Sequence, residues 1–117
     1  MSKPFDLEER TYLFARDCRF YVQKLPKTIS NIEDGKQLIR SSGSVGANYI
    51  EANEKLGDKD LSFRLKIARK EAKESKYKIR LLEDLNSNLK EESNLLFIEA
   101  EELRKILSTI ISKTSWI

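Results

Sequence analysis

Apolar and small residues recur along most of the chain at the three- and four-residue spacing of one helix face. Four such stripes follow one another, with short polar segments between them. They predict helices at about residues 7–25, 31–56, 59–86 and 89–113. The stripes would form the core, and their members are Leu7, Thr11, Phe14, Cys18, Tyr21 and Leu25, then Leu38, Ser42, Val45, Tyr49, Ala52 and Leu56, then Leu61, Leu65, Ala68, Ala72, Ser75, Ile79 and Leu82, and last Leu96, Ala100, Leu103, Leu107 and Ile110.

Turn and capping signals mark the ends of these helices. Asp6 and Ser30 each precede a glutamate by three residues, which is the spacing of a capping box. Pro26 would end the first helix, Gly57 would cap the end of the second, and Asn88 would cap the start of the fourth. Four rods joined by short turns predict an all-α, antiparallel up-down four-helix bundle, folded as a single domain over residues 1–117.

Composition removes several classes of function. The 117 residues include no histidine and one cysteine, which excludes the ordinary zinc sites and every mechanism with a histidine nucleophile or base. Cys18 lies on the first stripe, so we expect a small core residue and not a reactive thiol. No apolar run of about 18 residues and no secretory leader is visible, which predicts a cytoplasmic protein without a membrane span. We expect no enzymatic activity, no cofactor and no metal, and an enzyme of unknown chemistry is the least favoured alternative.

Residues 41–54, SSGSVGANYIEANE, fit a helix poorly by composition but well by pattern. Their two glycines each cost about 1 kcal/mol relative to alanine in a helix. The spacing lacks what a phosphate-binding Walker A loop needs, and the apolar period continues through the stretch. We therefore expect an unbroken second helix whose small residues let the third helix approach closely. The residues of this packing motif would be Ser42, Gly43, Gly46 and Asn48 on the second helix and Ala68, Ala72 and Ser75 on the third.

The run GKQLIRSSGSVGANYIEANE at residues 35–54 resembles the signature of a known family, the S23-like 23S rRNA intervening-sequence proteins. The family pattern is Gln-Leu-x-Arg, a serine-rich turn, Ser-Ile/Val-Gly-Ala-Asn, and then an acidic and a small residue. It falls here on Gln37, Leu38, Arg40, Ser44, Val45, Gly46, Ala47, Asn48, Glu51 and Ala52. A Lys-Leu-Pro-Lys turn at 24–27, Ala-Arg-Lys-Glu-Ala at 68–72 and a closing Leu-x-x-Ile-Ile extend the resemblance to nearly the whole chain.

The resemblance implies a four-helix bundle and a homopentameric ring. The family is also related to the accessory variability determinant of diversity-generating retroelements. For that branch the resemblance implies binding to a reverse transcriptase and to nucleic acid. Nothing in this sequence distinguishes the retroelement branch from the intervening-sequence branch.

A second set of apolar residues lies away from the predicted core. At 100° per residue, these side chains point roughly opposite the core stripes of the first and third helices. Large apolar residues on the outer side of a bundle often mark an interface, although scattered exposed hydrophobics are also common. We expect self-association, with an interface that includes Leu13, Phe20, Phe63, Ile67 and Leu81.

The third helix also carries a stripe of positive charge. The chain has 22 basic and 19 acidic residues, and the excess is concentrated in residues 58–80. Five cations and one tyrosine that could stack on an unpaired base follow the three- and four-residue spacing: Lys59, Lys66, Lys70, Lys73, Tyr77 and Arg80. A solvated helix face is the plainer explanation. The function we expect is a homo-oligomeric RNA- or DNA-binding accessory factor, with a protein-binding scaffold as the alternative.

Overall fold

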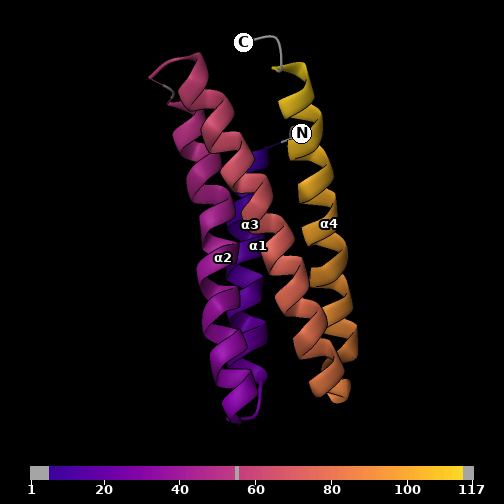
Figure 1. Ribbon diagram of the computed structural model, residues 1–117. Coiled ribbons are helices and arrows are strands. Elements are labelled where there is room, and N and C mark those ends of the chain that lie inside the picture. Colours follow the sequence, from indigo (N-terminus) through magenta and orange to yellow (C-terminus); the bar gives the residue numbers. More distant parts are fainter. Residues whose placement is uncertain (1–5, 55, 115–117) are drawn as a thin grey trace.

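The computed structural model describes residues 6–54 and 56–114. Its four long helices are α1 (Leu7–Lys24), α2 (Ile29–Asn53), α3 (Asp58–Leu85) and α4 (Lys90–Lys113), and a short 3-10 turn, η1 (Ser87–Leu89), precedes α4. The helices run alternately up and down, with α1 behind α2 and α3 in the view of Figure 1. Contacts join α1 to α2, α2 to α3, α3 to α4 and α4 back to α1. The predicted all-α four-helix bundle is confirmed.

The core consists largely of the predicted stripes. All six residues of the first stripe are buried, and Tyr21 and Phe14 are the largest fully buried side chains of the described residues. Leu56 is an error of the prediction, because it is 96% exposed in the turn that follows α2. The helix ends three residues earlier than expected, at Asn53. An apolar residue in register with a stripe therefore need not belong to the helix.

The helix ends differ from the capping signals at three of four places. The Asp6 carboxylate accepts a hydrogen bond from the Glu9 amide at 3.2 Å, as predicted. The cap of α2 is Thr28 and not Ser30, and η1 replaces the expected cap at Asn88. Gly57 stands at the start of α3 and not at the end of α2. Several polar residues near each end could cap equally well, so tertiary packing decides which one does.

The glycines of α2 face α1, which corrects the predicted seam with α3. A methyl group at Gly46 would lie 2.8 Å from the Thr11 hydroxyl oxygen, and one at Gly43 would lie 3.2 Å from a guanidinium nitrogen of Arg19. That Arg19 side chain lies across α2 and donates to the Ile39 carbonyl at 3.3 Å. The glycines therefore admit side chains and backbone of α1 to the surface of α2.

The seam between α2 and α3 is built by other small residues. The hydroxyl oxygens of Ser41 and Ser75 lie 2.8 Å apart, and Ala68 and Ala72 are fully buried beside them. Ser42 is buried as well, but its hydroxyl donates to the Ile39 carbonyl of its own helix. Small residues do line this seam, with Ser41 in the position predicted for the glycines.

A buried pair of amides joins the two hairpins at the end of the bundle that holds the α1–α2 turn. The Asn31 side chain donates to Asn86 at 3.0 Å, and the Asn86 side chain donates back to Asn31 at 2.8 Å. Each amide donates a second bond to a backbone carbonyl, that of Pro26 from Asn31 and that of Leu82 from Asn86. Two hydrogen bonds thus join the start of α2 to the end of α3, and two local ones hold each amide in place.

Candidate nucleic-acid interface

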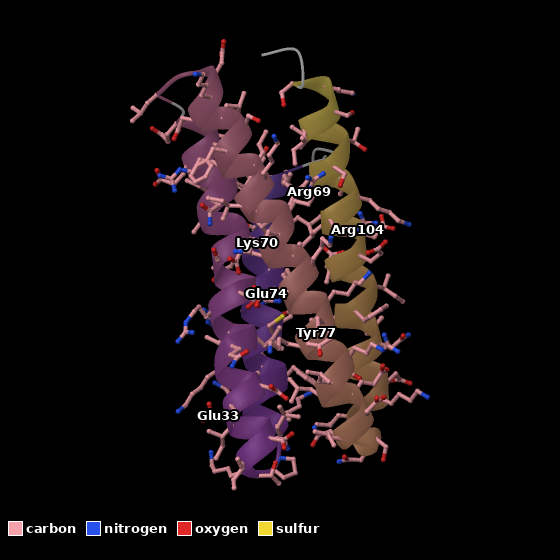
Figure 2. The ribbon with its side chains drawn as sticks, in the orientation of Figure 1. Glu33, Arg69, Lys70, Glu74, Tyr77 and Arg104 are labelled. Atoms are coloured by element: carbon pink, nitrogen blue, oxygen red, sulfur yellow. The ribbon has the colours of Figure 1, made fainter. Side chains whose placement is uncertain are left out.

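The predicted basic stripe lies on the outer face of α3. All six of its side chains, Lys59, Lys66, Lys70, Lys73, Tyr77 and Arg80, are exposed. At 100° per residue they point away from the buried face of the helix, which carries Ala68, Ala72 and Ile79. Figure 2 shows Lys70, Glu74 and Tyr77 in that order along α3, which passes in front of the other helices. Because the apolar face of α3 is buried in the core, the stripe on the opposite face must point toward solvent.

Ion pairs divide the cations of α3 into two groups. Lys76 binds Glu101 of α4 at 2.9 Å, and Arg64 lies 3.5 Å from Asp60 and also reaches the Asn48 side chain of α2. These two cations hold the flanks of α3 against its neighbours. The cations of the stripe, by contrast, make no ion pair with any carboxylate of residues 6–54 and 56–114. Their charge is available to an external anion.

Four stripe residues come together in one open depression of about 550 Å³. Its lining residues are Lys66, Arg69, Lys70, Lys73, Glu74, Tyr77 and Lys78. Lys59 and Arg80 are not part of it and extend the stripe beyond the two ends. The depression therefore presents five cations, one carboxylate and one aromatic ring.

Sequence reasoning missed Arg69 and Lys78. At 100° per residue they lie on opposite sides of the stripe, about 80° and 100° around the helix from Tyr77, so the spacing rule leaves them out. The structure places them beside it because long basic side chains reach across a helix surface. Arg69 also lies 3.5 Å from the Ser108 hydroxyl of α4, and the Lys78 ammonium lies 5.5 Å from the centroid of the Tyr77 ring.

Two acidic residues beside the depression, Glu71 and Glu74, lie on the side of the stripe that faces α2. Burial raises the pKa of the Glu71 carboxyl, the neighbouring Glu74 raises it further, and Lys70 acts in the opposite direction. Glu74 is exposed and lines the depression. A phosphate would meet this carboxylate on one flank and cations everywhere else.

Four of the five predicted interface residues fall into two separate patches. Phe20 of α1 is 51% exposed and lines a hollow between α1 and α4, together with Leu95 of α4. Leu13 is half-buried on the same side of α1. Leu95 is 65% exposed and was missed, since its neighbour Leu96 carries the core pattern. We call Leu13, Phe20 and Leu95 the α1/α4 patch.

The other three residues lie on α3. Phe63 is 59% exposed, and Ile67 and Leu81 are half-buried. At 100° per residue they lie between the basic stripe and the side of α3 that meets α2. Phe63 and Ile67 are neighbours on successive turns, whereas Leu81 lies about 21 Å farther along the helix axis. We call Phe63 and Ile67 the α3 patch. Because α1 contacts α2 and α4 while α3 lies between those two helices, the α1/α4 patch and the α3 patch face different directions.

Two ion pairs close the groove between α1 and α4. The Arg10 guanidinium donates two hydrogen bonds to Glu99, at 2.7 and 2.9 Å, and Lys24 binds Glu92 at 3.0 Å. Lys24 lowers the pKa of the Glu92 carboxyl, and Glu99 raises the pKa of Arg10 through the shared hydrogen bonds. These charges hold α4 on α1, where direct helix contact is sparse.

Asn48 of the packing motif has a structural set of contacts. Its side-chain amide donates to the backbone carbonyl and to the hydroxyl of Ser44, each at 2.9 Å. Its carbonyl oxygen lies 3.5 Å from the guanidinium of Arg64 on α3. Half-buried between two helices, Asn48 thus links α2 to the flank of α3.

No helix in the described ranges 6–54 and 56–114 is long and apolar enough to cross a lipid bilayer.

Comparison with known proteins assigns the fold to a family. A solved structure similar to this chain is the crystal structure of a protein with unknown function from the S23 ribosomal protein family of Bacteroides thetaiotaomicron VPI-5482. The two chains are 30% identical with a TM-score of 0.76, and the match covers 89% of this chain and 96% of that one. No match was found among curated proteins. The family model described as 23S rRNA-intervening sequence protein matches residues 5–109, so this chain belongs to that family.

Proposed function

We propose that the protein is a nucleic-acid-binding accessory factor and that the basic stripe of α3 is its binding surface. The observation that carries the proposal is the separation of charges on α3. Arg64 and Lys76, on the flanks of the helix, have carboxylate partners, whereas the stripe cations have none among the described residues. Lys66, Lys70 and Lys73 face solvent together. The name of the family refers to ribosomal RNA, which supports RNA as the first ligand to test.

The binding we propose is electrostatic and reads few or no bases. Lysine ammonium groups contact phosphates as point charges, and phosphate contacts position a nucleic acid without specifying its sequence. Each neutralised phosphate releases counterions, so affinity should fall steeply with salt. At a rise of about 1.5 Å per residue, Lys66, Lys70 and Lys73 are separated by about 6 and 4.5 Å along the helix axis, and Lys59 and Arg80 lie about 10.5 Å beyond the two ends of that group. The stripe can therefore contact several phosphates of one backbone.

Self-association would multiply these contacts. The α1/α4 patch and the α3 patch differ in composition and in direction, so they favour a head-to-tail contact between copies, which closes into a ring when the rotation allows. A ring of five is what the family resemblance implies. It would repeat the basic stripe around its axis and raise weak affinities through avidity. A reverse transcriptase as protein partner rests on the resemblance alone.

The test is charge reversal on the stripe. We expect the triple change Lys66→Glu, Lys70→Glu and Lys73→Glu to abolish binding to RNA and DNA at low salt. The matched control reverses three other exposed lysines, Lys27, Lys36 and Lys105, and so changes the net charge by the same amount. Binding would be measured by fluorescence anisotropy over a series of salt concentrations.

Two results would overturn the proposal. One is an equal loss of affinity in the stripe variant and in the control variant, which would indicate a response to net charge only. The other is an unaltered parent protein that binds neither RNA nor DNA at low salt. In that second case a protein-binding scaffold becomes the better explanation of the exposed apolar patches.

A further inference from the structure

We infer that the stripe takes an unpaired nucleic-acid strand, with Tyr77 as the ring on which a base stacks. The inference rests on the proposed function and adds the class of ligand. It starts from the position of one side chain. Tyr77 is 58% exposed on the face of α3 opposite the core, where an aromatic ring contributes nothing to the packing of the bundle.

The surroundings of Tyr77 suit a nucleotide. Lys73 precedes the ring by one helical turn, about 6 Å, and Arg80 follows it by about 4.5 Å. Neither cation has a carboxylate partner among the described residues. The Lys78 ammonium lies 5.5 Å from the ring centroid. A strand that places its phosphates on these cations therefore brings its bases within reach of the ring.

Only an unpaired strand can use the ring. In a duplex each base face is covered by its neighbours in the stack, so lysines can contact the phosphates while Tyr77 has no base to meet. In a single strand a base can turn outward and stack on the aromatic side chain, which depends little on base identity. Two contributions to affinity can thus be separated. The charges of the stripe bind single and double strands alike, and stacking on Tyr77 adds affinity for single strands only.

The chain offers a matched control for the stacking component. Tyr12 of α1 is 60% exposed, close to the value for Tyr77. It lines a different hollow, between α1 and α2, and is not part of the basic stripe. Removing either ring takes away one exposed tyrosine without disturbing the core. Any difference in affinity between the two variants therefore comes from the place of Tyr77 in the basic stripe.

The experiment compares five proteins on two ligands. The proteins are the parent, Tyr77→Ala, Tyr77→Phe, Tyr12→Ala and the triple lysine reversal of the stripe. The ligands are a mixed-sequence single-stranded RNA long enough to span α3 and the same RNA paired with its complement. Dissociation constants are measured at one low salt concentration, and circular dichroism checks that each variant is folded.

We expect Tyr77→Ala to weaken single-strand binding roughly tenfold, since the stacking of one base on the ring is lost. Its duplex binding should stay within about twofold of the parent, and Tyr77→Phe and Tyr12→Ala should match the parent on both ligands. Equal losses on both ligands, or no loss on either, would overturn the inference. The triple lysine reversal keeps the two proposals apart, because it should lose both ligands even where Tyr77 proves irrelevant.

Discussion

Gly46 has no side chain beyond a hydrogen atom, and this lets α1 approach α2 closely at that position. The methyl group of an alanine there would lie 2.8 Å from the hydroxyl oxygen of Thr11 and 3.2 Å from its Cβ. Thr11 is fully buried, and its hydroxyl donates to the Leu7 carbonyl at 2.8 Å, so the side chain has little freedom to move aside. The contact involves a stiff β-branched residue, which makes the site intolerant of added volume.

Gly46→Ala should therefore destabilise the protein, although alanine is the better helix former. Overpacking costs about 1–3 kcal/mol, and the gain in helix propensity returns at most about 1 kcal/mol. Thr11→Ala should recover part of the loss, so the double variant should be more stable than the sum of the single changes predicts. Urea unfolding of all four proteins measures this coupling.

Gly46→Leu should prevent correct folding altogether. A Gly46→Ala protein as stable as the parent, or a double variant that is simply additive, would show that Gly46 does not make the contact that limits the approach of α1.

For single residues, the sequence predicted burial correctly where the helical spacing of apolar residues was enough to decide it. The burial of Cys18 followed from its place on the stripe, and that burial raises the pKa of its thiol to about 12. The partner of Gly46 could not be predicted in the same way. The period tells which residues share a face of α2, but not whether that face meets α1 or α3.

Among the elements, α3 and α4 are joined by a cluster of charges around one carboxylate. Glu101 accepts two hydrogen bonds from Arg104, at 2.9 and 2.7 Å, and one from Lys76 of α3 at 2.9 Å. The Lys76 ammonium also lies 5.6 Å from the centroid of the Phe97 ring. These hydrogen bonds, first those of Arg104 and then that of Lys76, lower the pKa of Glu101 to about 2.

The sign of this shift predicts how stability depends on pH. Because the pKa of Glu101 is lower in the folded state than its ordinary value of 4.5, the ionised form stabilises the fold above that value. The contribution should disappear as the pH falls from about 4.5 to about 2. We expect Glu101→Gln to be less stable than the parent at pH 7 and nearly equal to it at pH 2, as measured by urea unfolding.

Glu102→Gln is the control, since the neighbouring Glu102 side chain is exposed and neutralisation there changes the charge of α4 equally. The effect at Glu101 should be small, because the cluster is partly open to water. A stability difference that persists at pH 2 would contradict the assignment to the ionised carboxylate.

At the scale of the helices, the sequence predicted which cations of α3 face outward but not which of them form ion pairs. The sequence placed all nine cations of residues 58–80 on one helix and identified the outward-facing stripe correctly. It could not show that Lys76 is paired with Glu101, because that carboxylate lies 25 residues away on another helix. The caps predicted at Ser30, Gly57 and Asn88 were wrong for the opposite reason, since several local signals were available at each of these helix ends.

For the molecule as a whole, two unlike apolar patches make a specific prediction about assembly. In a head-to-tail contact, Phe20→Glu spoils the α1/α4 patch and leaves the α3 patch intact, and Phe63→Glu does the reverse. Each variant alone should be monomeric, because neither retains a complementary pair of patches. A mixture of the two should form a heterodimer through the intact patches but no larger ring.

Light scattering of the parent, both variants and their mixture measures this outcome. Ile29→Glu is the control, because Ile29 is 84% exposed at the end of the bundle and outside both patches. A parent that remains a 13.6 kDa species at every concentration would remove the oligomer from the proposal. A mixture that stays monomeric while the parent assembles would argue against a contact between the two unlike patches.

The paired amides of Asn31 and Asn86 have a consequence for which packing the chain can choose. Four stripes of similar spacing could slide past one another by a helical turn, about 5.4 Å, and still bury apolar side chains. Such a shift would separate the two amides and break both hydrogen bonds between them, while the local bonds to Pro26 and Leu82 could remain. Each buried polar group left unpaired in this way costs about 1–3 kcal/mol. The pair therefore fixes the register of the helices. It adds little to the stability of the native bundle, but it disfavours bundles in which the helices are shifted by a turn.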